Sequence, residues 1–149
     1  METERKFLVK NNDWRDIRHE SIHIEQFYLA VDPPTVVRAR KYISQYYLSI
    51  KSRVSNESSL EFDKEISSNE YEGLKKIAKP GLISKMRHHI PYEGMIWHLD
   101  EFLDHNKGLL LAEIEFETGA KVLIPSWIGD EVTGNLQYNN AYLASNCIV

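Results

Sequence analysis

The sequence predicts an all-β-dominated (α+β) fold, with a few helices, in a single domain spanning residues 1–149. Apolar and polar residues alternate with a period of two along most of the chain, which is the repeat of a half-buried strand. The links between these segments are short, including proline-containing turns at residues 32–34 and 79–81, so neighbouring strands are expected to be antiparallel. Hydrophobic residues make up 42% of the chain, which is enough for one core.

About eight segments carry the strand alternation, and each is bounded by turn-forming or polar residues. The expected strands are residues 2–9, 22–29, 36–42, 46–54, 60–66, 82–90, 96–103 and 109–117.

Helical patterns are fewer. Ser67 and Glu70 have the spacing of a capping box, and apolar residues follow at helical spacing until residues 80–81 end the helix. We also expect a short helix near residues 12–17 and a last helix at 135–145. The apolar residues of the first pattern are Tyr71, Leu74, Ile77 and Ala78.

The composition excludes several classes of partner. Lysine and arginine total 18 against 22 for aspartate and glutamate, so the net charge of −4 gives no general attraction to nucleic acid or an anionic membrane. The only cysteine, Cys147, excludes an intramolecular disulfide and a cysteine-rich zinc module. No apolar run approaches the roughly 20 residues of a membrane helix, and the charged first residues do not resemble a signal peptide. We therefore expect a cytoplasmic protein with no nucleic-acid or membrane partner.

Charged residues recur at i and i+2 in strand after strand, which places them on one face of each strand. For any single strand this face could simply meet water, but acids and bases are sorted by strand, which a hydrated face does not need. If the strands closed into a barrel with these faces inward, a polyanion would suit the basic side and divalent cations the acidic side. The charged faces contain Glu2, Glu4 and Lys6; Arg38 and Arg40; Lys51; Glu61, Asp63 and Glu65; Lys85 and Arg87; Asp100; and Glu113 with Glu115.

A known family shares this arrangement. Glu2-Thr3-Glu4-Arg5-Lys6 matches the ExExK signature of the CYTH domains, also called triphosphate tunnel metalloenzymes. Ordered companions follow, so the sequence resembles that family over essentially its whole length. The companions lie at residues 26–29, 37–40, 48–51, 61–66, 85–87, 97–102, 108–115 and 125–133.

The resemblance implies a closed eight-stranded antiparallel β-barrel, a tunnel with a polar, charged lumen and a few covering helices. It also implies hydrolysis of a triphosphate group with Mg²⁺ or Mn²⁺, two ions per site, and inorganic triphosphate, cleaved to pyrophosphate and phosphate, is the favoured substrate. The implied metal-binding residues are Glu2, Glu4, Glu113 and Glu115, with Glu61 and Asp100 as further ligands or as holders of basic residues. The implied phosphate-binding residues are Lys6, Arg38, Arg40, Lys51, Lys85 and Arg87, and the implied catalytic residues are Glu4, Lys85 and Tyr28.

Two mechanistic hypotheses follow from this assignment. We expect one of the acidic residues Glu4, Glu113 and Glu115 to help activate the attacking water on a metal ion. We also expect Tyr28 to hydrogen-bond Lys85 and adjust its approach to a phosphate. Three positions depart from the family pattern and leave the finer specificity open, namely Asp63, His88 and His98.

Other readings of the sequence are weaker or remain open. Residues 19–23 match the HExxH pattern of zinc peptidases, but that pattern needs a helix and the alternation predicts a strand here. His88 and His89 are expected on opposite faces of a strand, and the tryptophans on the outer surface under helices.

The same tunnel would serve a class IV-type adenylate cyclase, a nucleoside or thiamine triphosphatase, or a non-catalytic polyphosphate sensor. Exposed apolar strand faces also allow a homodimer.

Overall fold

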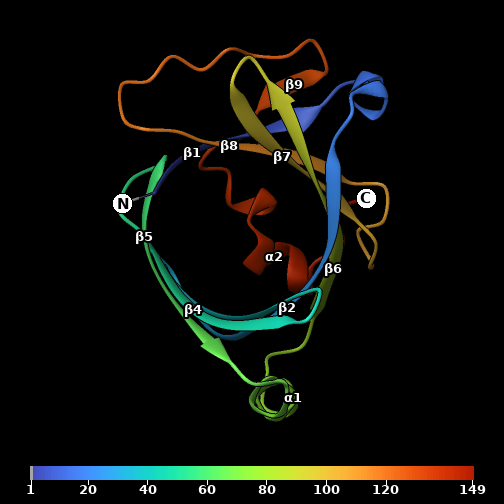
Figure 1. Ribbon diagram of the computed structural model, residues 1–149. Coiled ribbons are helices and arrows are strands. Elements are labelled where there is room, and N and C mark those ends of the chain that lie inside the picture. The colour runs from blue at the N-terminus through green and yellow to red at the C-terminus, as the bar shows by residue number, and fades with distance from the viewer. Residues whose placement is uncertain (1) are drawn as a thin grey trace.

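Antiparallel strands curve into a closed barrel, which confirms the expected fold class (Figure 1). The computed structural model describes residues 2–149, except for the side chain of Glu2. The strands are β1 (Glu2–Val9), β2 (Glu20–Asp32), β3 (Thr35–Tyr42), β4 (Gln45–Arg53), β5 (Ser58–Ile66), β6 (Leu82–Tyr92), β7 (Met95–Phe102), β8 (Leu110–Glu115) and β9 (Ile128–Glu131).

The strand order explains how the barrel closes. Neighbouring strands follow the order β5-β4-β3-β2-β6-β7-β8-β1-β9, and β1 also pairs with β5. This closing contact pairs Glu2 with Ser59 and Thr3 with Ser58, whereas β1 and β8 pair over five positions. The extra strand β9 lies along the later part of β1 and was not predicted, because four residues are too few for alternation to be recognised.

Each barrel strand separates an outer core from the lumen. Phe7, Trp97 and Leu99 point outward into a buried cluster, while residues one position away along the same strands point inward. The three tryptophans are nearly inaccessible and lie in this outer cluster, as expected, but no α-helix of the described residues covers them, because strands, loops and one short 3₁₀ helix supply its members. Its buried members are Phe7, Trp14, Ile90, Trp97, Leu99, Ala112, Ile114, Trp127 and Ile128.

Two of the predicted helical segments lie outside the barrel. Helix α1 (Ser68–Lys76) begins with the expected capping box, because the Ser67 hydroxyl accepts from the Glu70 amide at 3.1 Å and the Glu70 carboxylate accepts from the Ser67 amide at 2.9 Å. Its Tyr71 ring packs against Phe27 with centroids 5.0 Å apart. The short 3₁₀ helix η1 (Asp13–Asp16) buries Trp14.

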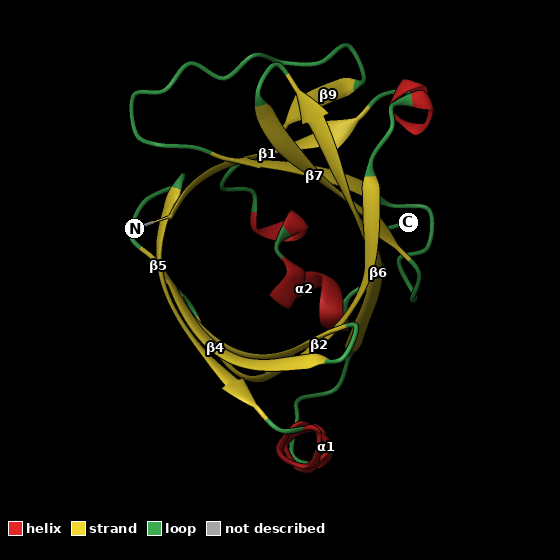
Figure 2. Ribbon diagram, viewed as in Figure 1, coloured by secondary structure: helices red, strands yellow, loops and turns green. Residues whose placement is uncertain are grey.

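The C-terminal helical segment lies inside the ring of strands instead of covering an outer face (Figure 2). It consists of the 3₁₀ turn η2 (Leu136–Tyr138) and helix α2 (Asn140–Ser145). Leu143 and Ala144 pack against inward-facing apolar residues such as Phe102 and Leu111. The inner wall is therefore apolar at this end, which explains why an apolar helix fills it.

The strand assignment also decides two readings left open above. Strand β2 begins at Glu20, so residues 20–23 are extended and the helix that an HExxH zinc site requires is not formed. The ring of His88 packs against Trp14 outside the barrel, and that of His89 packs against His98, which lines the lumen, so the two histidines point to opposite faces as predicted. In the described part of the chain, no helix has the length and apolar character needed to cross a lipid bilayer.

The position of α2 leads to a stability prediction. Leu143 is fully buried, so L143A should lower the free energy of unfolding by about 2–5 kcal/mol through lost apolar contacts and a residual cavity. Chemical denaturation followed by tryptophan fluorescence measures this loss. The control L136A changes a leucine that is 64% exposed and should shift stability by no more than about 0.5 kcal/mol. Equal effects of the two variants would show that α2 does not hold this end of the barrel.

Candidate active site

The lumen contains a cavity of about 660 Å³. Acidic, basic and histidine side chains from seven strands line it, because inward positions on those strands carry the alternating charges seen in the sequence. They are Glu4, Lys6, Arg38, Arg40, Lys51, Arg53, Glu61, Asp63, Arg87, His98, Glu113 and Glu115, and Tyr28 also lines the cavity. Of the remaining predicted site residues, Lys85 and Asp100 are buried beside the cavity, and the side chain of Glu2 lies outside the described part of the structure.

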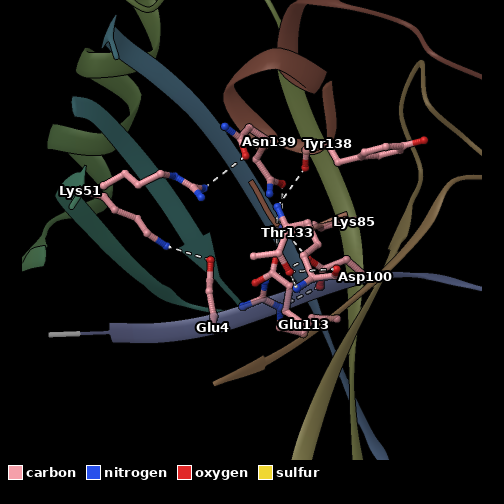
Figure 3. Close-up of polar contacts among 12 residues, drawn as sticks. Glu4, Lys51, Lys85, Asp100, Glu113, Thr133, Tyr138 and Asn139 are labelled. Atoms are coloured by element: carbon pink, nitrogen blue, oxygen red, sulfur yellow. Dashed lines mark hydrogen bonds and ion pairs between the residues drawn. The ribbon is translucent and has the colours of Figure 1, made fainter. Parts of the chain in front are cut away.

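Asp100 organises the buried end of this site (Figure 3). Its carboxylate accepts from the Lys85 ammonium at 2.8 Å and from two guanidinium nitrogens of Arg87 at 2.8 and 2.9 Å. Asp100 is 1% exposed and Lys85 is completely buried, so these charges have little water to solvate them. Both carboxylate oxygens accept hydrogen bonds from cations, so Asp100 positions these two basic side chains.

The protonation of this cluster reflects both burial and charge. Burial alone would raise the pKa of Asp100, but Arg87 and Lys85 outweigh it and hold that pKa far below its usual range. Burial lowers the pKa of Lys85 to about 7, because the attraction of Asp100 is opposed by the positive charges of Arg87 and Arg40. Lys85 is thus a lysine that can change charge near neutral pH.

The predicted hydrogen bond between Tyr28 and Lys85 is not present, and this expectation was wrong. The Tyr28 hydroxyl accepts instead from the Gln26 amide at 3.2 Å, since both side chains point inward from β2. Beyond Asp100, the Lys85 ammonium donates to the carboxamide oxygen of Asn140 at 3.0 Å. The Tyr28 hydroxyl hydrogen is left to be donated toward the cavity that this residue lines.

The basic wall of the cavity is formed by β3 and β6. Arg38 donates to Glu61 at 2.7 Å, so this acidic residue holds a cation here. Arg40 is buried and donates to two neutral groups, Gln26 at 2.8 Å and the Tyr42 hydroxyl at 2.6 Å. Burial and the nearby Arg38 lower the pKa of Arg40, so an anion in the cavity would relieve repulsion between these guanidinium groups.

The acidic wall is formed by β1 and β8. Glu4 lies directly opposite Glu115 and Lys6 opposite Glu113 in the antiparallel pairing of these strands. Glu4 is 3.7 Å from the Lys51 ammonium, and Glu113 is 3.4 Å from that of Lys6. Burial would raise the pKa of Glu113, but Lys6 and Arg87 outweigh it and lower that pKa to about 2, so this carboxylate is charged near neutral pH.

The donor chemistry of the acidic wall fits a hard divalent cation. Glu4, Glu113 and Glu115 supply carboxylate oxygens from two paired strands, and such oxygens are the ligands that Mg²⁺ and Mn²⁺ prefer. Among the side chains that the structure describes, no three histidine, cysteine, aspartate or glutamate side chains form a ready-made cluster. Lysines are close to two of these carboxylates, so a cation would have to compete with them.

Sequence reasoning did not assign several polar residues to the site, among them Arg53, His98 and Asn140. Arg53 and His98 could have been found from spacing alone, since each is two positions from a predicted site residue on the same strand. Arg53 donates to Asn139 at 3.4 Å. Asn140 could not have been found, because its contact with Lys85 depends on α2 entering the barrel. In the same way the Lys6 ammonium donates to the carbonyl oxygen of Tyr138 at 2.9 Å.

His98 has an unusual setting for a histidine. It lies between His89 and Glu113 in the strand pairing and lines the cavity. Burial, followed by the charges of Arg87 and His89, lowers the pKa of its ring to about 4. The ring is therefore neutral near pH 7.

Known proteins resemble this chain over nearly its full length. It is 35% identical over 147 residues to an inorganic triphosphatase of Acetivibrio thermocellus, covering 97% of this chain and 94% of that protein. It is 32% identical over 149 residues to an inorganic triphosphatase of Nitrosomonas europaea, covering 96% of each. A crystal structure of an inorganic triphosphatase superposes with a TM-score of 0.73 at 28% identity, covering 98% of this chain and 95% of that one. A scan of family models finds no match.

The closed barrel and its two oppositely charged walls define a tunnel protein built to bind a small polyanion. The relatives show which family of tunnel proteins this is. The chain belongs to the CYTH family, or triphosphate tunnel metalloenzymes, as its sequence motifs indicated. A putative adenylyl cyclase from Hippeastrum, described as having a dominant triphosphatase activity, shares the fold with a TM-score of 0.60 at 16% identity.

The Asp100 cluster leads to a second stability prediction. D100N leaves Lys85 and Arg87 buried without an anion, and loss of one partner from a buried ion pair costs about 3–5 kcal/mol. Chemical denaturation at pH 7 measures the loss. Because the folded pKa of Asp100 is lowered, the wild-type advantage is present above about pH 4 and declines as the pH falls further. The control E131Q alters a partly exposed pair with Arg5 and should cost no more than about 1 kcal/mol.

The titration of Lys85 can be measured directly. In protein labelled with ¹³C-lysine, one side-chain signal should shift with a midpoint near pH 7, and K85M should remove that signal. Because the folded pKa lies below the ordinary value of 10.5, the native state binds fewer protons than the unfolded chain between these pH values. The contribution of Lys85 to the free energy of unfolding therefore rises as the pH increases from about 7 to about 10.5. A midpoint near 10 would contradict this account.

Proposed function

We propose that the protein hydrolyses inorganic triphosphate to pyrophosphate and phosphate inside the barrel. The observation that carries this proposal is the meeting of a basic and an acidic wall on one cavity of about 660 Å³. Near-full-length relatives named inorganic triphosphatase support the same substrate.

Basic side chains of the basic wall, of β4 and of β1 would bind the substrate. Triphosphate carries about four to five negative charges near neutral pH, and its hydrolysis depends more on charge neutralisation and alignment than on a protein nucleophile. Guanidinium groups offer paired donors to phosphate oxygens, whereas lysines act as compact point charges. We assign phosphate binding to Lys6, Arg38, Arg40, Lys51, Lys85 and Arg87, and we add Arg53 because it lines the same cavity.

The acidic wall would hold the metal. We propose that Glu2, Glu4, Glu113 and Glu115 bind Mg²⁺ or Mn²⁺, with two ions per site. Asp100 and Glu61 instead position basic side chains through ion pairs. When bound, such ions neutralise phosphate oxygens and lower the pKa of a water molecule. Glu4 lies on this wall, where its carboxylate can accept the proton of the attacking water.

Two further residues would act on the phosphate chain. Lys85 can place a positive charge, or a proton, beside the leaving phosphate because its pKa lies near neutrality. Tyr28 would donate its hydroxyl hydrogen to a phosphate oxygen, since that hydroxyl already accepts from Gln26. This role replaces the predicted contact with Lys85.

The alternatives make different use of the acidic wall. A non-catalytic polyphosphate sensor would gain nothing from carboxylates that face its ligand, because like charges weaken anion binding. A cyclase needs a pocket for ribose and base in addition to the phosphate site. The cytoplasmic location, the absence of nucleic-acid and membrane partners, and the homodimer remain predictions.

Phosphate release tests the proposed function. Wild-type protein with Mg²⁺ or Mn²⁺ should release phosphate from inorganic triphosphate faster than from ATP or pyrophosphate, and chelator should abolish release. E4A should lower kcat at least about 100-fold, because it removes a group proposed to take a proton in the reaction. The matched control is E72A, which changes an exposed glutamate of α1 and should retain full activity.

The same experiment separates the alternatives. Tight binding of triphosphate with no phosphate release would identify a sensor, and formation of cyclic AMP from ATP would identify a cyclase. Full activity of E4A would remove Glu4 from the catalytic role while leaving the substrate assignment intact.

A further inference from the structure

Among the described residues, His98 is the one histidine that lines the cavity. It projects from β7 on the same face as Asp100, two residues further along the strand. In the antiparallel pairing of β7 and β8 it lies directly opposite Glu113, and directly opposed residues have Cβ atoms about 4.5–5.5 Å apart. The imidazole is therefore part of the acidic wall.

The ring nitrogens of His98 form no hydrogen bond with any described residue. Four of the other histidines do: His88 pairs with Ser21 and Glu101, and His23 pairs with Ser84. His19 and His105 likewise meet backbone carbonyl oxygens. His89 shares the lack of a hydrogen bond but does not line the cavity, and its ring packs against that of His98 in a tilted arrangement with centroids 4.8 Å apart. The ring of His98 is half-buried and lines the cavity, so a ligand bound there can be the partner of its nitrogens.

The surroundings of His98 favour a cation over a phosphate as that partner. Its neighbour across the strand pair, Glu113, is a charged carboxylate. Glu115 lies two residues further along β8, and Glu4 is paired with Glu115 on β1. Arg87 also acts on the ring, so this preference applies to the side of His98 that faces Glu113. On that side a phosphate would face a like charge, whereas a divalent cation would be attracted. Imidazole and carboxylate together form a ligand set for first-row transition metals.

We propose that His98 supplies an imidazole nitrogen to the divalent cation that the carboxylates of Glu113 and its neighbours bind. This inference rests on the proposed metal site of the acidic wall. A nitrogen ligand favours Mn²⁺ over Mg²⁺, because Mg²⁺ prefers oxygen ligands alone. The protein is thus expected to select Mn²⁺ more strongly than a tunnel lined by carboxylates only.

Pulsed electron paramagnetic resonance of bound Mn²⁺ tests this ligand directly. Wild-type protein with Mn²⁺ alone, and with Mn²⁺ plus pyrophosphate, should show the magnetic coupling of a directly bound ¹⁴N nucleus. Replacing the histidines by ¹⁵N-labelled histidine should convert that coupling to the ¹⁵N pattern, which assigns it without any mutation. H98Q should remove the coupling, while the matched control H89Q should retain it.

Metal affinity provides the second readout. H98Q should weaken Mn²⁺ binding at least about tenfold, since loss of even an indirect partner of a metal ligand commonly costs that much. Mg²⁺ affinity, measured by competition, should change less, so the preference for Mn²⁺ declines. H98E should recover binding of both metals through oxygen but show no nitrogen coupling. Near-UV circular dichroism that matches wild type shows that each variant is folded.

The outcomes separate this inference from the proposed function. Bound Mn²⁺ without nitrogen coupling in wild-type protein would overturn the role of His98 and leave the carboxylate site in place. Coupling that disappears in H89Q and persists in H98Q would overturn it in favour of His89. Failure of wild-type protein to bind Mn²⁺ under either condition would overturn the metal site itself.

Discussion

The ion cluster of Lys85, Arg87 and Asp100 is the interaction on which the rest of the tunnel depends. Cations cannot be buried inside a barrel unless an anion and hydrogen bonds replace the water they lose. Asp100 provides this replacement by using both oxygens, and Asn140 adds a neutral acceptor from the C-terminal segment. One carboxylate facing two cations leaves an excess of positive charge, and a polyanionic substrate is suited to balance it.

The two faces of the strands explain why much of the fold and site could be predicted from the sequence. Outward positions such as Trp97 and Leu99 fill an apolar core, and inward positions such as His98 and Asp100 face the lumen. This alternation is local, so it can be recognised without knowing which strands are neighbours. The sorting of acids and bases by strand then determines which wall is basic and which is acidic, and the ExExK signature indicates the family.

Features that depend on distant contacts could not be predicted. The last helical segment is recognisable as a helix, but its place inside the barrel follows from the apolar end of the lumen, which forms only when β2, β6, β7 and β8 meet. That placement brings Asn140 to Lys85. The expected contact between Tyr28 and Lys85 is absent for a similar reason. The Tyr28 hydroxyl accepts a hydrogen bond from Gln26, and the Lys85 ammonium donates one to Asn140. Strand β9 was missed because four residues carry too little periodicity.

The short contact between β1 and β5 is the seam of the barrel. Two residue pairs join these strands, and the Glu4 amide donates to the carbonyl oxygen of Glu57 just before β5, so little hydrogen-bond energy resists their separation. The ion pair of Glu4 with Lys51 spans the seam from the side of the lumen. A ligand that contacts both Lys51 and Glu4 would cross-link the barrel wall at this short strand contact. The wall would be more stable there while the ligand is bound and less stable after its release.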